Sequence, residues 1–427
     1  MSNKQPYPSL DQPRIALLSV HTSPAAALGG KKTGGMNVYV GEIAREFGRR
    51  GIRVDIFTRV AEPAQQGQIW EFAPHVRLVH LPAGPPQALD PDELYLHLNE
   101  FRDAMLAFAR REAIAYDFIY SHYWLSGWVA VQLRRRWGIP VAQMFHTLGR
   151  MKNRIADRPT REDDIRVRGE SEVLDHADRI IAATPAERSQ LLLLYRADRR
   201  KIDIVPPGVD LTRFHPDDRA ASRAFIDWSP QKRHFLFVGR IERLKGLDNI
   251  FEAVAEIRQS RPDLAAQMCI SIIGGDPHDG NEEMQRLQTL RDMLGITPQI
   301  ALIGAKGQDV LPHYYRAAEA LIMPSDYESF GMVALEAMAC GTPVIASEVG
   351  GLAFLVEDGK TGYHIPVREP SILAQRIIQL LESPETGDEL GRAAALTARD
   401  YSWPRIADQL LSTFTMLGTK PKVIRLR

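Results

Sequence analysis

Cysteine is almost absent from this chain. Only Cys269 and Cys340 occur among its 427 residues, so a framework of disulfides is not supported and a reducing compartment is compatible with the composition. The N-terminal segment 1–13 is polar and rich in proline, without the apolar stretch of a secretory leader. We therefore expect a cytoplasmic protein.

A net charge and long apolar runs are missing as well. The 53 basic residues are balanced by 53 acidic ones, whereas nucleic acid or a membrane surface as partner would require a basic excess. No segment approaches the ~18 consecutive apolar residues of a membrane span. With 44% hydrophobic residues, the chain is long enough to build two ordinary cores. We expect two domains and small-molecule partners, and the composition leaves homo-oligomerisation open.

Two ligand-binding motifs are also absent. The loop after the first predicted strand lacks the Gly-x-Gly-x-x-Gly fingerprint, which disfavours a two-domain NAD-dependent dehydrogenase. No clear Asp-x-Asp metal motif stands in a loop that could hold a phosphate donor. Because Arg, Lys and helix N-termini can meet phosphate charge, we expect neither a required metal nor a required cofactor.

The first half of the chain alternates short apolar runs with amphipathic segments. The runs are continuously apolar, as in strands that are buried on both faces of a parallel sheet; they cover residues 15–20, 54–58, 76–81, 118–121, 141–146 and 179–183. Between the first two runs, a helix is predicted by the i, i+3, i+4, i+7 stripe of Val40, Ile43, Ala44 and Phe47. This repeated pattern predicts a doubly wound α/β domain.

Two prolines and a glycine interrupt the rhythm at residues 204–210, which we take as a stiff connector. The rhythm then restarts, with apolar runs at 235–238, 270–273, 301–303, 321–323, 344–346 and 362–365. We expect a first Rossmann-like domain over 1–207 and a second over 208–399, with a last helix starting near Ser402 and Trp403. Ligands of open parallel sheets bind beyond the carboxyl ends of the strands, so a cleft between the domains is expected to hold them.

Two glycine-containing segments could bind anions. Gly34 and Gly35 precede Asn37 at a predicted helix start, where backbone N–H groups and the helix dipole favour anions; a flexible loop is the alternative. In the second half, Arg240 and Lys245 follow a buried strand with glycines on either side. Such cations could stabilise the negative charge of a departing nucleoside diphosphate, although a solvated turn would have the same composition.

The most informative stretch is residues 324–343. Glu328 lies in a loop after a predicted strand, and Glu336 lies about two turns into the helix that follows. That helix is opened by Phe330, Gly331, Met332 and Val333. Two carboxylates at this separation could accept hydroxyls from a sugar and from a ribose at opposite ends of a diphosphate.

These motifs resemble those of the family 4 glycosyltransferases. The likeness is carried by the Glu-x7-Glu spacing, by Val238-Gly239-Arg240 with Lys245-Gly246, and by the segments 34–40 and 121–127. The last two are similar to the branch that holds the mycothiol-pathway N-acetylglucosaminyl transferases and the sucrose-phosphate synthases. The resemblance covers nearly the whole chain. It implies two Rossmann-like lobes of the B type, a final helix over 400–427 that crosses back to the first lobe, retention of anomeric configuration and no required metal.

The resemblance also implies roles at the donor end. Arg240 and Lys245 would hold the diphosphate, Glu328 the hydroxyls of the donor sugar, and Glu336 the ribose. Lys306 matches the loop that meets the base. Gly34, Gly35 and the helix start 330–333 would complete the nucleotide-sugar site. His146 would lie over the donor sugar, unless it is a strand-end histidine with a structural role.

The acceptor end matches less completely. Asn37, Tyr123, Thr147 and Arg166 fall on acceptor positions, and the last three match residues that hold an acceptor phosphate in the mycothiol-type enzyme. The fourth phosphate holder, a Lys, falls on Pro91 here, and Lys31, Lys32 or Lys152 could supply its charge. Arg166 could instead be a structural ion-pair partner of Asp163, Asp164 or Glu170.

The sequence therefore predicts a retaining transferase that moves a hexosyl group from a UDP-sugar to a small phosphorylated acceptor, such as fructose 6-phosphate or inositol phosphate. One alternative is transfer to unphosphorylated fructose, as in sucrose synthases. Another is a two-lobed protein that binds sugars without catalysing a reaction. The paired cations Arg240 and Lys245 count against it, because a binding protein does not need to stabilise a leaving diphosphate.

Overall fold

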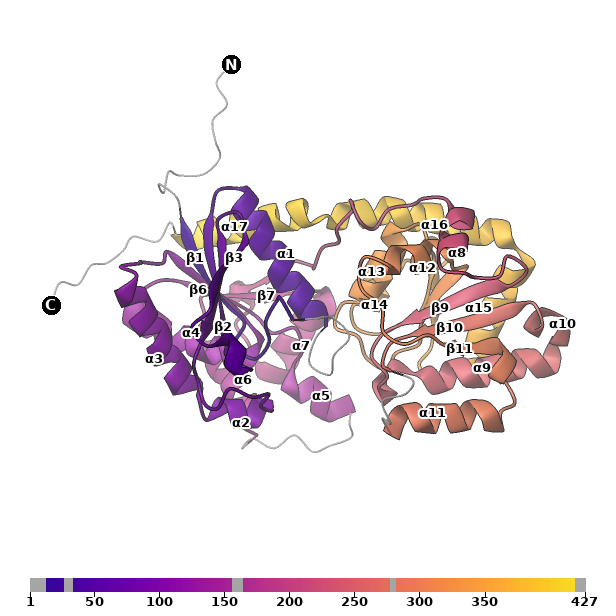
Figure 1. Ribbon diagram of the computed structural model, residues 1–427, viewed down its shortest axis with the longest axis horizontal. Coiled ribbons are helices and arrows are strands. Elements are labelled where there is room, and N and C mark those ends of the chain that lie inside the picture. Colours follow the sequence, from indigo (N-terminus) through magenta and orange to yellow (C-terminus); the bar gives the residue numbers. More distant parts are fainter. Residues whose placement is uncertain (1–12, 27–33, 156–163, 277–281, 419–427) are drawn as a thin grey trace, which may run out of the picture. The chain divides into compact units, whose positions relative to one another are not determined.

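The computed structural model describes residues 13–26, 34–155, 164–276 and 282–418 (Figure 1). The chain forms two compact units, which we call the N-terminal and C-terminal units. The N-terminal unit comprises the described residues of Met1–Ala26, Gly35–Pro206 and Trp403–Arg427, and the C-terminal unit those of Ala27–Gly34 and Pro207–Ser402.

The N-terminal unit is built on an eight-stranded sheet with the order β3-β4-β2-β1-β5-β6-β7-β8. Its strands are β1 (Arg14–Leu18), β2 (Arg53–Arg59), β3 (Ile69–Ala73), β4 (Val76–Leu81), β5 (Phe118–His122), β6 (Val141–Met144), β7 (Arg179–Ala182) and β8 (Ile202–Ile204). All neighbours pair in parallel except β3 and β4. The two outermost strands, β3 and β8, were not predicted from the sequence.

Helices pack against this sheet through apolar stripes. They are α1 (Gly35–Arg49), α2 (Pro91–Tyr95), α3 (Leu98–Arg111), α4 (Tyr123–Trp137), α5 (Gly149–Ile155), α6 (Ile165–His176), α7 (Pro185–Tyr195) and α17 (Trp403–Gly418). The predicted stripe of α1, from Val40 to Phe47, is buried. Helix α17 returns to this unit from the end of the chain, and its Phe414 ring lies 4.3 Å from that of Phe118 in β5.

The C-terminal unit contains a six-stranded parallel sheet with the order β11-β10-β9-β12-β13-β14. Its strands are β9 (Arg233–Val238), β10 (Met268–Ile273), β11 (Ile300–Leu302), β12 (Ala320–Met323), β13 (Val344–Ser347) and β14 (Gly362–Ile365). The order reverses direction between β9 and β12, and at such a switch point the carboxyl ends of the strands leave a crevice for ligands. The predicted doubly wound α/β class is confirmed for both units.

The helices of the C-terminal unit are α8 (Arg219–Phe225), α9 (Leu247–Ser260), α10 (Pro262–Ala265), α11 (Glu282–Met293), α12 (Leu311–Ala317), α13 (Met332–Ala339), α14 (Leu352–Leu355), α15 (Pro370–Glu382) and α16 (Pro384–Ala398). Across both units, no helix within the described ranges is long and apolar enough to cross a membrane. The same residues contain no group of three or more His, Cys, Asp or Glu arranged to hold a metal ion.

Helix α16 packs directly on the turn that ends α13. A Cβ added at Gly391 of α16 would lie 2.1 Å from the backbone oxygen of Gly341, far inside van der Waals contact. One turn earlier in the same helix, a Cβ at Gly387 would meet only the Leu380 side chain, at 3.7 Å. The two glycines are therefore a matched pair, one required by packing and one replaceable.

We predict opposite effects for alanine at these two positions. Gly391→Ala should lower the free energy of unfolding by about 1–3 kcal/mol, because backbone atoms must move apart to admit the methyl group. Gly387→Ala should leave stability unchanged or raise it by up to ~1 kcal/mol, because alanine restricts the unfolded chain and favours helix. Thermal and denaturant unfolding of both variants measure this. Equal stability of the two proteins would contradict the packing described.

Candidate functional site

Backbone contacts with glycines fix the loop that follows β12. A Cβ at Gly246 would lie 2.0 Å from the carbonyl oxygen of Pro324, and one at Gly350 would lie 1.9 Å from that of Glu328. The Gly351 N–H donates to the same Glu328 carbonyl at 2.9 Å. Gly246 and Gly350 also have φ values of 69° and 49°, which glycine adopts without strain. The position of Glu328 in the C-terminal unit is therefore set by main-chain contacts.

Lys245 and Glu328 are brought together in this loop region. The Nζ atom of Lys245 lies 2.6 Å from Oε2 of Glu328, and the two side chains are only 19% and 17% exposed. Arg240, the other predicted phosphate ligand, pairs instead with Glu242 at 2.6 Å, and its side chain is 51% exposed. The structure thus joins one of the two predicted cations to the predicted sugar ligand.

Glu336 occupies a buried position in α13. Its Oε2 accepts a hydrogen bond of 2.8 Å from the hydroxyl of Tyr315 in α12. Burial raises the pKa of Glu336 to about 7, while the Tyr315 hydrogen bond and the charge of Arg213 act in the opposite direction. Tyr315 and Arg213 were not predicted from the sequence, because nothing in their local pattern distinguishes them from packing and surface residues.

The start of α13 is as the sequence predicted. Gly331 is the N-cap with φ of 101°, and Met332 and Val333 form the first turn. Phe330 is buried, with its ring centroid 6.1 Å from that of Tyr401. Lys306 lies in the loop after β11, half-buried, and has no ion-pair partner within the described part of the chain.

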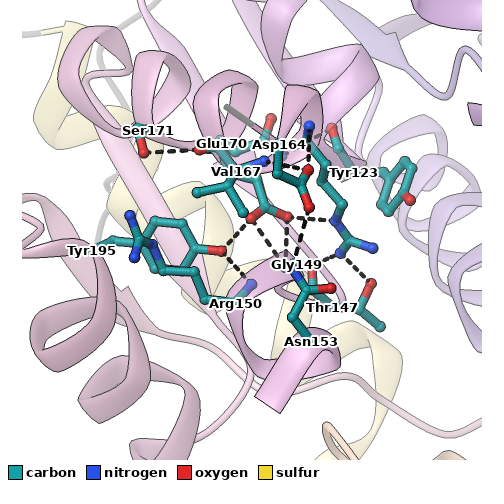
Figure 2. A network of polar contacts seen from close by, with 12 residues as sticks. Tyr123, Thr147, Gly149, Arg150, Asn153, Asp164, Val167, Glu170, Ser171 and Tyr195 are labelled. Carbon is teal, nitrogen blue, oxygen red and sulfur yellow. Dashed lines mark hydrogen bonds and ion pairs between the residues drawn. The ribbon is translucent and has the colours of Figure 1, made fainter. Parts of the chain in front are cut away.

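In the N-terminal unit, the predicted acceptor residues Tyr123, Thr147 and Arg166 converge (Figure 2). Nη2 of Arg166 donates to the backbone oxygen of Thr147 at 2.8 Å and to its Oγ1 at 3.0 Å. The guanidinium carbon lies 5.1 Å from the centre of the Tyr123 ring. Nε of Arg166 donates to Glu170 at 2.8 Å, so the ion pair considered as an alternative is also present. Asp164 caps α6, and Asp163 lies outside the described residues.

Glu170 is the centre of this network. Its carboxylate is fully buried, and both oxygens accept from the Gly149 N–H at 3.0 Å. The Tyr195 hydroxyl donates to Oε2 and accepts from the Arg150 N–H at 2.9 Å (Figure 2). One carboxylate therefore ties Arg166 to the first turn of α5, and a charge buried this deeply requires such partners.

Histidines follow three neighbouring strands, β1, β5 and β6. Nδ1 of His122 and Nε2 of His146 share a hydrogen bond of 3.0 Å. Burial, reinforced by nearby His21, lowers the pKa of His146 to about 3, so this ring is neutral at physiological pH. His146 also has φ of 62°, a conformation that is uncommon for a residue other than glycine and that clusters at functional sites.

The described ones among the remaining predicted residues lie in or next to α1, α2 and α5. Asn37 is buried in α1, and its amide donates to Thr22 Oγ1 and to the Ser23 carbonyl, both at 2.6 Å. Gly34 and Gly35 are exposed at the start of α1, and Lys152 is exposed in α5. Pro91 is the first residue of α2, behind an Asp90–Glu93 capping box. Lys31 and Lys32 lie outside the described residues.

Two family models match this chain. The "Glycosyl transferase 4-like domain" matches residues 34–208, and "Glycosyl transferases group 1" matches residues 218–397. Together they cover most of the sequence, and they divide it close to the boundary between the two units.

Among curated relatives, the D-inositol 3-phosphate glycosyltransferase of Actinosynnema mirum is 41% identical over 403 residues, which cover 94% of this chain and 96% of the relative. Among solved structures, the sucrose-phosphate synthase of Thermosynechococcus elongatus has a TM-score of 0.86 and 33% identity, with 95% of this chain and 99% of that chain covered.

The Anabaena protein HepE, solved in complex with UDP, has a TM-score of 0.74 at 18% identity and covers 95% of this chain and 100% of its own. At that identity the similarity shows the fold alone, which is the B-type fold predicted from the sequence motifs. The family models and the relatives agree: this chain belongs to the group 1 glycosyltransferases and is an enzyme that binds a nucleotide sugar.

Proposed function

We propose that this enzyme transfers a hexosyl group, with retention of configuration, from a UDP-sugar to a small phosphorylated sugar or polyol. The convergence of Tyr123, Thr147 and Arg166 carries this proposal, because a guanidinium and a hydroxyl held side by side suit a phosphate. The names of its relatives support it, since one acts on D-inositol 3-phosphate and another makes sucrose phosphate. A cytoplasmic location suits the two buried free cysteines, Cys269 and Cys340.

At the donor end, Lys245 would hold the diphosphate and Glu328 the sugar hydroxyls. In the structure these two groups form an ion pair, with 2.6 Å between Nζ of Lys245 and Oε2 of Glu328. A bound donor would supply phosphate charge to the lysine and hydroxyl donors to the carboxylate, so both groups would keep partners when their ion pair is separated. Arg240 would turn from exposed Glu242 toward the phosphate, which costs little because the Arg240–Glu242 pair lies in solvent.

At the acceptor end, the charge of Arg166 is offset by Glu170, and Pro91 stands where the resemblance to the mycothiol-type enzyme implies a lysine. These two features favour a second candidate function, transfer to an unphosphorylated acceptor such as fructose. A phosphorylated acceptor, by contrast, would depend on the hydrogen bonds of Thr147 and on the remaining donors of Arg166, rather than on an excess of positive charge.

We predict that loss of the lysine in the donor loop impairs chemistry. Lys245→Ala should reduce kcat/KM about a hundredfold or more, because one charge that stabilises the leaving diphosphate is lost, and Arg240→Ala should act in the same direction. Arg243→Ala is a matched control, since Arg243 stands in the same short turn but is 79% exposed and pairs with Glu283. Near-normal turnover of both Lys245→Ala and Arg240→Ala would remove the diphosphate assignment.

We predict that catalysis needs no divalent metal. Lys245, Arg240 and the N-terminus of α13 can together meet the phosphate charge. Turnover measured before and after extensive EDTA treatment should be the same within error. Loss of activity that Mg²⁺ or Mn²⁺ restores would contradict this.

We predict that the wild-type enzyme prefers a phosphorylated acceptor to its unphosphorylated parent. Arg166→Ala should raise KM for the acceptor far more than for the donor and should narrow this preference, because a guanidinium is the only cation among the three converging residues. Arg168→Ala, an exposed arginine of the same helix, is the control. Parallel kinetics with fructose 6-phosphate and fructose, and with inositol phosphate and inositol, measure the preference.

Pro91→Lys is the complementary change and should widen the preference. Pro91 occupies the first position of α2, where a backbone N–H is unpaired in any helix, so lysine can replace it without loss of a hydrogen bond. Equal kcat/KM for the phosphorylated and unphosphorylated member of each pair in the wild type would favour the neutral-acceptor function.

A further inference from the structure

The carboxylate of Glu336 is held by one oxygen. Oε2 accepts the Tyr315 hydroxyl at 2.8 Å, whereas no hydrogen bond to Oε1 is found within the described ranges. The residue is only 7% exposed, yet Oε1 is not among the fully buried oxygens left without a partner, so this oxygen is open to solvent. A glutamate side chain has three rotatable bonds, and a tether at one oxygen fixes the direction in which the other points.

Tyr315 is itself immobile. Its side chain has no solvent exposure, and its ring centroid lies 6.0 Å from that of Phe214. The hydroxyl of Thr342, at the end of the α13 turn, donates to the Tyr315 carbonyl at 2.6 Å. The phenol is thus positioned from both α12 and the segment after α13, and its only hydrogen-bond partner among the described residues is Glu336.

Burial opposes the ionisation of Glu336, and the hydrogen bond from Tyr315 favours it. Burial raises the pKa of this carboxyl, the Tyr315 hydrogen bond and the charge of Arg213 lower it, and the balance is a pKa of about 7. The charge of Glu336 also acts on the thiol of Cys340, the residue that ends α13, and burial raises the pKa of this thiol to about 12, so it is protonated. The Tyr315 hydrogen bond therefore favours the ionised form of Glu336, in which both oxygens are acceptors.

We propose that Tyr315 is a positioning and specificity-determining residue, which tethers one oxygen of Glu336 so that the other faces the adjacent hydroxyls of a nucleotide ribose. This rests on the proposed role of Glu336 in ribose binding. The hydrogen bond from Tyr315 holds the Glu336 carboxylate in place, so that its second oxygen is preorganised to accept hydrogen bonds from the two adjacent ribose hydroxyls. A 2′-deoxyribose nucleotide leaves part of that acceptor unpaired, and buried unpaired groups are the strongest basis for rejecting a ligand.

The test compares the affinities of ribose and 2′-deoxyribose forms of one donor. Wild-type protein should bind UDP-glucose at least about tenfold more tightly than its 2′-deoxyribose counterpart. Tyr315→Phe should weaken UDP-glucose binding about three- to tenfold, as expected for one hydrogen bond, and should reduce the discrimination between the two ligands. Tyr363→Phe is the matched control, because the Tyr363 hydroxyl accepts from Gln379 in the same unit and has no contact with Glu336.

The pH dependence separates this role from simple packing. Ribose hydroxyls donate to the ionised carboxylate, so affinity should be full above the pKa of Glu336 and fall as pH drops through about 7. Tyr315→Phe removes a hydrogen bond that favours ionisation of Glu336. The pH at which the affinity for UDP-glucose is half-lost should therefore be higher in this variant than in the wild type. UDP-glucose is used as the ligand because it lacks the terminal phosphate group of UDP. Such a group, like a phosphate monoester, titrates near pH 6 and would overlap the titration of Glu336.

Each outcome bears on one of the two ideas. Unchanged discrimination and an unchanged midpoint in Tyr315→Phe would overturn the role of Tyr315. Unchanged discrimination in Glu336→Gln would instead overturn ribose binding by Glu336. If Tyr315→Phe does not fold, replacement of Tyr315 by 3-fluorotyrosine provides the second measurement: its more acidic phenol should lower the midpoint, and a midpoint that stays in place would overturn the proposal.

Discussion

Direct contact between backbone carbonyls and glycines holds the carboxyl edge of the C-terminal sheet in place. Gly246 meets the Pro324 carbonyl and Gly350 meets the Glu328 carbonyl, at separations that exclude any side chain. Because these loops are joined through main chain, Lys245 and Glu328 depend little on the conformations of neighbouring side chains. The proposed chemistry of the donor end therefore stands on a rigid base, as preorganised electrostatic sites require.

Both ends of the proposed reaction share one electrostatic arrangement, a partly buried cation held by a carboxylate. At the donor end Lys245 pairs with Glu328, and at the acceptor end Arg166 pairs with fully buried Glu170. The pairs differ in one respect. Glu328 has no other hydrogen bond in the described structure apart from its backbone contacts, whereas Glu170 also binds Gly149 and Tyr195. In the proposed function a donor separates the first pair, whereas the second pair is part of the framework.

Sequence alone predicted the α/β class, because continuous apolar runs are local signals. Tyr123, Thr147 and Arg166 were singled out by their resemblance to a family, and in the structure their side chains are in contact. The edge strand β3 escaped prediction because Ile69 and Trp70 are exposed and short edge strands lack a continuous apolar pattern. Glu170 was predicted only as one of three possible ion-pair partners of Arg166, and the partners Tyr195 and Tyr315 escaped prediction for a different reason. Their importance comes from contacts made across the fold, and the residue types themselves look ordinary on their helices. Ligand roles of individual residues remain predictions.

The return of α17 to the N-terminal unit has a consequence for biosynthesis. Phe414 packs on Phe118 and Phe47, and Trp403 packs edge-on against Tyr39, so the last helix supplies part of the first unit's core. On the ribosome, residues 35–206 emerge long before these aromatic partners exist. Nearly all of the described C-terminal unit comes from one segment, 207–402, whereas the core of the N-terminal unit also requires residues 403–418. The core that begins earlier in the sequence can therefore be completed only after the C-terminal unit has been synthesised.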